Sequence, residues 1–136
     1  MYLIGFPLLV ITFAIYNIIA FLMPGLNWTD KITSIPLASG QVWTVTTEDV
    51  LISVAMLLLA VEVIKSTRLG IRTIVDHILS LVLFIAMLVE FLLVKQAGTS
   101  TFFILMVASV VDVVAGFTVT TRTAQRDLLV EKTDKV

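Results

Sequence analysis

The chain has 136 residues, of which 59% are hydrophobic, and a mean hydropathy of +1.09. A soluble domain is apolar over about 45 to 50% of its residues, so the composition excludes that class and predicts one integral membrane domain over residues 1–136. The net charge of −1, with no basic stripe, excludes a nucleic-acid-binding surface. Because there is no cysteine and only one histidine, His77, we expect no metal site and no cofactor.

The first apolar run covers residues 3–23. As a helix it is long enough to cross about 30 Å of hydrocarbon, and it ends at Pro24-Gly25. No positive segment precedes it and no small-residue cleavage site follows closely, so we expect a retained membrane span rather than a removed signal peptide. Its polar positions are Thr12, Tyr16 and Asn17.

Residues 31–46 are predicted to form a short β-hairpin. Trp43 and Val45 alternate with threonines, and residues 38–40 supply the turn. Trp28 and Trp43 suit the membrane interface, where an indole ring has one wet and one apolar side. A ligand-binding lid is the alternative, but the sequence favours an interfacial hairpin that covers the mouth of a helix bundle.

Three further spans are predicted at residues 48–65, 78–94 and 101–121, followed by a polar tail at 122–136 that could extend the last helix. The sequence therefore predicts an all-α membrane protein, a four-helix transmembrane bundle with a short extracytoplasmic hairpin between the first two spans. Thr46, with acidic residues after it, is the expected cap of the second span.

Charged residues near the ends of these spans have simple interpretations. Glu62 and Lys65 are three residues apart, which predicts a surface ion pair where the second span ends. Asp76 and His77 precede the third span, so Asp76 is the expected helix cap and His77 an interfacial residue at the inner mouth.

The basic residues orient the chain. Two of them, Lys31 and Lys95, fall on one side of the predicted spans, and seven fall on the other: Lys65, Arg68, Arg72, Arg122, Arg126, Lys132 and Lys135. The positive-inside rule then places both termini in the cytoplasm and the hairpin outside.

One carboxylate, Asp112, lies in the middle of the fourth span. An aspartate at this depth costs about 2.5 to 3.5 kcal/mol on insertion scales, so it is expected to be buried in protein, paired or functional. At helical spacing Ala108 and Gly116 share its face, with Ser109 and Ala115 beside it. Such a small-residue surface lets two membrane helices approach closely, so we expect Asp112 to face another helix.

Two other acids lie at different depths. At 1.5 Å per residue, Glu90 lies about 7 Å, Asp112 about 16 Å and Glu62 about 21 Å from the outer ends of their spans. Three carboxylates at such depths are the kind of series that proton relays and cation pathways use. Thr12 lies near the depth of Asp112, and Tyr16 and Asn17 lie near that of Glu90, so all three are expected hydrogen-bond partners.

Several segments resemble small bacterial inner-membrane proteins with four predicted spans and no assigned activity. They are residues 1–7 (MYLIGFP), 14–25 (AIYNIIAFLMPG), 74–77 (IVDH), 112–117 (DVVAGF) and 123–127 (TAQRD). The resemblance implies a bacterial inner-membrane location and implies no chemistry. Length and span number also resemble the small multidrug transporters, but their essential first-span glutamate has no counterpart here.

Two functions follow as expectations. Because phosphate-binding, metalloprotease and nucleophile-elbow motifs are absent, we expect a protein that is not an enzyme. The first expectation is a structural or accessory subunit, whose Asp112 face and tail contact the helices of a homo-oligomer or larger complex within the lipid bilayer. The second is a small proton- or cation-coupled transporter or channel that uses Glu90, Asp112 and Glu62.

Overall fold

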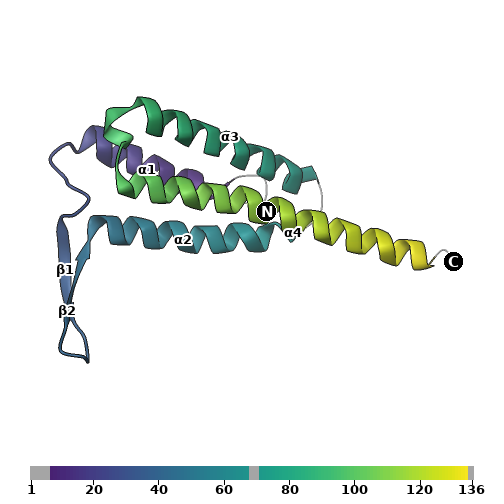
Figure 1. Cartoon of the computed structure of the whole chain (residues 1–136), viewed down its shortest axis with the longest axis horizontal. Coiled ribbons are helices and arrows are strands. Elements are labelled where there is room, and N and C mark those ends of the chain that lie inside the picture. Colours follow the sequence, from purple (N-terminus) through teal and green to yellow (C-terminus); the bar gives the residue numbers. More distant parts are fainter. Residues whose placement is uncertain (1–6, 68–70, 135–136) are drawn as a thin grey trace.

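The computed structural model describes residues 7–67 and 71–134, which form a mostly helical fold with one two-stranded antiparallel sheet. In chain order the elements are α1 (Leu9–Leu22), β1 (Lys31–Pro36), β2 (Val42–Thr46), α2 (Thr47–Lys65), α3 (Ile71–Leu93), the 3-10 helix η2 (Lys95–Ala97) and α4 (Ser100–Asp134). The four α-helices run along roughly the same axis (Figure 1). The hairpin and the α3–α4 connection lie at one end, and the last turns of α4 project beyond the other (Figure 1).

Two of these helices, α3 over residues 74–93 and α4, are long and apolar enough to cross a membrane. The helix α1 has 14 residues, or about 21 Å of length, because it begins only after Pro7. The predicted start of the first span at residue 3 falls within residues 1–6, which lie outside the described residues. The helix α2 spans 19 residues and carries Glu48, Asp49, Glu62 and Lys65, which lower its hydropathy.

The predicted third and fourth spans are both longer helices than expected. Because α3 already begins at Ile71, Asp76 lies inside the helix, and the prediction that it caps the span is wrong. The helix α4 continues without a break through Arg122 to Asp134. The tail predicted at 122–136 is therefore helical as far as residue 134, and residues 135 and 136 lie outside the described part.

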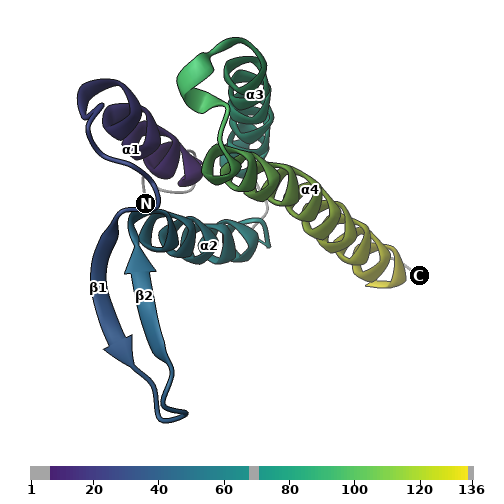
Figure 2. The same ribbon diagram turned by 60° about the vertical axis from the view of Figure 1, so that its left-hand side comes forward.

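The hairpin is confirmed. Ile35 pairs with Trp43 and Ser34 with Thr44 across two antiparallel strands, and Gly40 turns the chain with a φ of 89°, which favours glycine. Figure 2 shows that the hairpin projects sideways from the start of α2, away from α1 and α3. It therefore does not cover the mouth of the bundle, contrary to the prediction.

The start of α2 follows the expected capping rule. The Thr46 hydroxyl accepts a hydrogen bond from the Asp49 N–H at 3.4 Å, and the Asp49 carboxylate accepts one from the Thr46 N–H at 3.0 Å. This capping box satisfies two backbone donors and fixes the point at which the hairpin ends and the helix starts.

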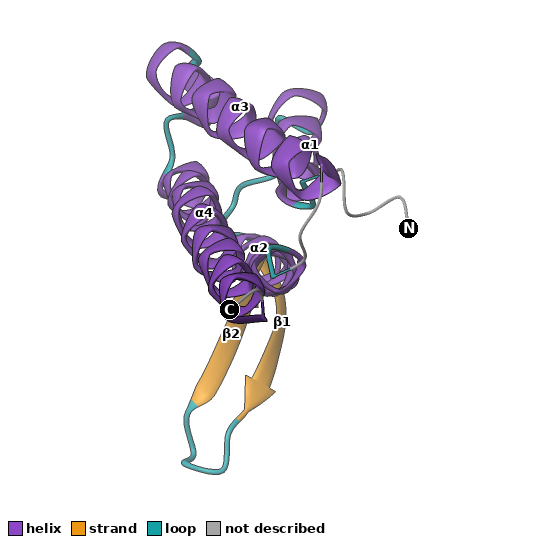
Figure 3. Cartoon of the chain, turned by 90° about the vertical axis from the view of Figure 1, so that its right-hand side faces the viewer, coloured by secondary structure: helices purple, strands orange, loops and turns teal. Residues whose placement is uncertain are grey.

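The interior of the helical fold is divided along its length. The helix α4 packs against both α2 and α3, and Figure 3 shows these helices and α1 in a view turned by 90°. Buried apolar side chains, including Tyr16, Leu51, Met87 and Phe102, fill the half nearer the hairpin. Most of the buried polar side chains lie in the other half, where α2 ends and α3 begins.

Candidate functional site

A cluster of buried polar side chains occupies the end of the bundle opposite the hairpin. We call it the polar centre. It draws on three helices, and every member is at most 8% exposed; its members are Glu62, Lys65, Ser66, Asp76, His77, Ser80, Ser109 and Asp112. Buried polar groups are costly unless they are paired, so a cluster of this size is a candidate functional site.

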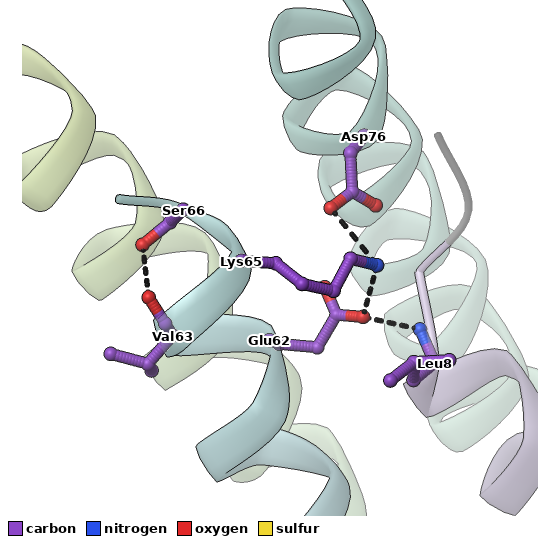
Figure 4. A network of polar contacts seen from close by, with 6 residues as sticks. All are labelled: Leu8, Glu62, Val63, Lys65, Ser66 and Asp76. Carbon is purple, nitrogen blue, oxygen red and sulfur yellow. Dashed lines mark hydrogen bonds and ion pairs between the residues drawn. The ribbon is translucent and has the colours of Figure 1, made fainter. Parts of the chain in front are cut away.

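Lys65 bridges two acids from different helices (Figure 4). Its Nζ lies 3.0 Å from Glu62 Oε1 on α2 and 3.4 Å from Asp76 Oδ2 on α3. The predicted Glu62–Lys65 pair is therefore present, but both residues are buried, so the prediction that it lies at the surface is wrong. The sequence could not show that Asp76 lies beside the Lys65 ammonium group, in the place that water would take in a surface ion pair.

Glu62 also holds the start of α1. Its Oε1 accepts a hydrogen bond of 2.6 Å from the backbone N–H of Leu8, 54 residues earlier in the chain, as Figure 4 shows. Leu8 is the N-cap of α1 and its own side chain makes no capping bond. A carboxylate at this position satisfies a free N–H and complements the positive end of the helix dipole.

Asp112 lies in the same centre and is 4% exposed. The groups that act on it electrostatically include Glu62, Asp76, Lys65 and the Ser80 hydroxyl. Among the described residues, four buried side-chain atoms have no hydrogen-bond partner: Asp76 Oδ1, Ser80 Oγ, Ser109 Oγ and Asp112 Oδ2. All four belong to the polar centre, and an unsatisfied buried polar group costs about 1 to 3 kcal/mol.

The small-residue face around Asp112 is turned into the chain itself. Ala108, Ser109 and Gly116 are buried and Ala115 is half-buried, and α4 packs against α2 and α3. Asp112 therefore faces other helices, as the spacing of the small residues predicts. Those helices are in the same chain.

Gly116 allows a close approach to His77. A Cβ added to Gly116 would lie 2.8 Å from His77 Cε1 and 3.1 Å from Nδ1. The imidazole is 5% exposed and lies 5.0 Å from the ring of Phe117. Because α3 begins about two turns before the predicted span at 78, His77 lies inside the helix, and its ring is packed against α4.

Replacing Gly116 with alanine is expected to lower the free energy of unfolding by about 1 to 3 kcal/mol, because the added methyl group overlaps a buried ring. Thermal unfolding of the purified protein in mild detergent measures the change. Gly25→Ala is the matched control, since a Cβ there meets nothing within 4 Å. Equal melting temperatures for the two variants would contradict the close packing of Gly116 on His77.

Glu90, Asn17 and Thr12 lie outside the polar centre. Asn17 Nδ2 donates to Glu90 Oε2 at 3.4 Å, which agrees with the predicted partnership. The Thr12 hydroxyl donates to the Leu9 carbonyl at 2.9 Å within its own helix. Between Ser80 and Glu90, the buried positions of α3 are Leu83 and Met87. The structure thus brings Glu62 and Asp112 together, and an apolar layer separates them from Glu90.

Residues from three separate helices thus converge in the polar centre. Within residues 7–67 and 71–134, no three His, Cys, Asp or Glu side chains are arranged to hold a metal ion. No protein family, curated protein or solved structure matches the chain.

Proposed function

We propose that the chain is a multi-pass inner-membrane protein that moves protons, alone or in exchange for a small cation, through the polar centre. Glu62, Asp76 and Asp112 are the groups that would hold and release the proton. The observation that carries this proposal is the burial of three carboxyl groups around one ammonium group. Glu90 has no part in the proposal because apolar side chains separate it from the centre.

The membrane placement is supported by the surface as well as by the two long apolar helices. Large apolar side chains are exposed along the helices, among them Leu57 at 70% and Leu92 at 68%. Water would be a poor solvent for such a surface, whereas lipid tails suit it. Because α1 and α2 lie beside α3 and α4 (Figure 1), we infer four passes with both termini in the cytoplasm.

The charge balance of the polar centre supports proton binding. Among the described residues of the polar centre, Lys65 supplies one positive charge against three carboxyl groups, and it can neutralise only one of them. An unpaired charge in a low-dielectric interior is far more costly than a neutral carboxyl group. The centre is therefore expected to hold protons on some of its acids, and an incoming cation would displace one of them.

The Asp112→Asn variant tests this function, because the amide keeps the shape of the side chain but cannot exchange a proton. We expect proton uptake into liposomes under an imposed membrane potential to fall about tenfold or more relative to the wild-type protein, or about 1.4 kcal/mol in barrier. An internal pH-sensitive dye reports the uptake.

The control for this experiment is Glu131→Gln, which changes an exposed acid at the end of α4. It should leave uptake unchanged. Wild-type uptake no faster than in empty liposomes, or uptake by Asp112→Asn at the wild-type rate, would contradict the proposed function.

A second candidate, an accessory membrane subunit, is favoured by one observation. The end of α4 projects beyond the bundle (Figure 1) and exposes Leu128, Leu129 and Val130, each by more than half. Under this proposal the partner contacts the projecting end, since the Asp112 face is covered by α2 and α3. Native mass spectrometry after extraction in mild detergent would count against this candidate if it detected only this chain.

A further inference from the structure

A pocket lies at the hairpin end of the bundle, away from the polar centre. It has a volume of about 420 Å³, within the range of small-molecule sites. Three segments far apart in the sequence line it: the loop after α1, the start of α2 and the start of α4. Its seven lining residues are Asn27, Trp28, Thr29, Glu48, Thr99, Ser100 and Thr101.

The walls of the pocket are held in place by buried groups. The Thr101 hydroxyl, on a residue that is 1% exposed, donates to Glu48 Oε2 at 2.9 Å. The Glu48 N–H donates to the Trp28 carbonyl at 2.9 Å. The first bond ties the Glu48 carboxylate to α4, and the second ties the Glu48 backbone to the loop that carries the indole, so the site is formed before any ligand arrives.

One face of the Trp28 ring is stacked on Tyr16. Their rings stack with centroids 4.6 Å apart and an angle of 7° between the planes. The Tyr16 hydroxyl in turn lies 2.7 Å from Thr99 Oγ1 and donates to the Gln96 carbonyl at 2.8 Å. The aromatic wall and the hydroxyl wall of the pocket are therefore parts of one connected structure.

The chemistry of the lining favours one class of ligand. Glu48 is the charged residue among the seven, and its charge is negative. An indole attracts cations through its π-face, best of the aromatic rings, and the threonine, serine and asparagine oxygens accept hydrogen bonds from N–H groups. A small organic ammonium ion offers the positive charge, the apolar surface and the N–H donors that this combination complements.

We propose that this pocket binds small organic ammonium ions, with Glu48 as the counter-ion and Trp28 as the aromatic wall. The site goes beyond the proposed proton movement, because it lies at the other end of the bundle and binding there does not require a working polar centre. On α2, Glu48 and Glu62 are 14 residues apart, or about 21 Å.

Fluorescence of the purified full chain in detergent tests the proposal. The chain has two tryptophans, so the Trp43→Phe background leaves Trp28 as the only reporter. Titration with methylammonium or dimethylammonium chloride, at constant ionic strength, should give a saturable change in emission. Sodium chloride and glucose should give none.

Two variants in that background separate the site from a general effect of salt. Glu48→Gln should weaken the apparent affinity about tenfold or more, since it removes the counter-ion. Thr101→Val should weaken it several-fold, since it keeps Glu48 but frees the carboxylate from its partner. Glu131→Gln should bind like the parent.

A failure of this site is distinguishable from a failure of the proton function, because Asp112→Asn should bind the ammonium ions normally. The proposal is overturned if no ammonium ion gives a saturable change, if Glu48→Gln binds as well as the parent, or if glucose binds instead. Should Glu48→Gln fail to fold in a thermal melt, the Thr101→Val titration decides, and parent-like affinity there overturns the proposal.

Discussion

Replacing Lys65 with methionine is expected to lower the free energy of unfolding by about 3 to 5 kcal/mol. Methionine fills a similar volume but removes the ammonium group that lies between Glu62 and Asp76. Two buried carboxyl groups are then left without their cation, and removal of one partner of a buried ion pair costs far more than the pair contributes. Thermal or denaturant unfolding in mild detergent measures the loss.

The control for this prediction is Lys95→Met, which changes an exposed lysine at the other end of the bundle. Exposed charges contribute little to stability, so its melting temperature should stay close to that of the wild-type protein. Adding Glu62→Gln and Asp76→Asn to Lys65→Met should recover part of the loss, because the two carboxylates that Lys65 neutralises are then replaced by neutral amides. Equal stability of Lys65→Met and Lys95→Met would contradict the buried bridge.

Phe102→Ala is the second substitution with a large expected effect, also about 3 to 5 kcal/mol. Phe102 is fully buried and its ring contacts three others, with centroids 4.9 Å from Tyr16, 6.2 Å from Phe91 and 6.3 Å from Phe13. Its removal leaves a cavity where α1, α3 and α4 meet. The free energy of unfolding in detergent measures this effect.

The neighbouring residue supplies the matched control for Phe102. Phe103 has the same side chain but is 48% exposed, so Phe103→Ala leaves no internal cavity and should cost about 1 kcal/mol or less. A loss for Phe103→Ala as large as that for Phe102→Ala would show that the helix faces are assigned wrongly.

The parts of the fold that were predictable depend on local chemistry. The hairpin follows from alternating side chains and a turn that ends in glycine, and the capping box at Thr46 and Asp49 follows from three-residue spacing. The inward direction of Asp112 follows from small residues one turn away on either side. Each of these patterns is complete within a few residues of sequence.

What could not be predicted depends on which way each helix faces. In a helix that is apolar all round, hydropathy does not distinguish the buried side from the exposed one. The depths of Glu62, Glu90 and Asp112 in the membrane could therefore be estimated from the sequence. The sequence could not show that Glu62 and Asp112 lie close together while Glu90 lies apart from them. The ion pair between Lys65 and Asp76 and the full burial of Tyr16 could not be predicted for the same reason. Both depend on the side of its helix on which each residue lies.

The pocket beside Glu48 was missed for a different reason. Its lining comes from three segments, and none of them carries a motif by itself. One signal was present in the sequence, since Trp28 and Glu48 both flank the predicted hairpin. An interfacial position explains Trp28 by itself, and the helix dipole explains Glu48 by itself, so neither residue indicates a shared pocket.

The bond from Leu8 to Glu62 has a consequence for how the chain is made. The ribosome completes α1 long before it reaches residue 62, because 54 residues separate the two partners. During that interval the first turn of α1 lacks the carboxylate that caps it in the finished protein. Final docking of α1 therefore awaits the end of α2, so α1 is synthesised before α2 but reaches its native environment only after α2 is complete.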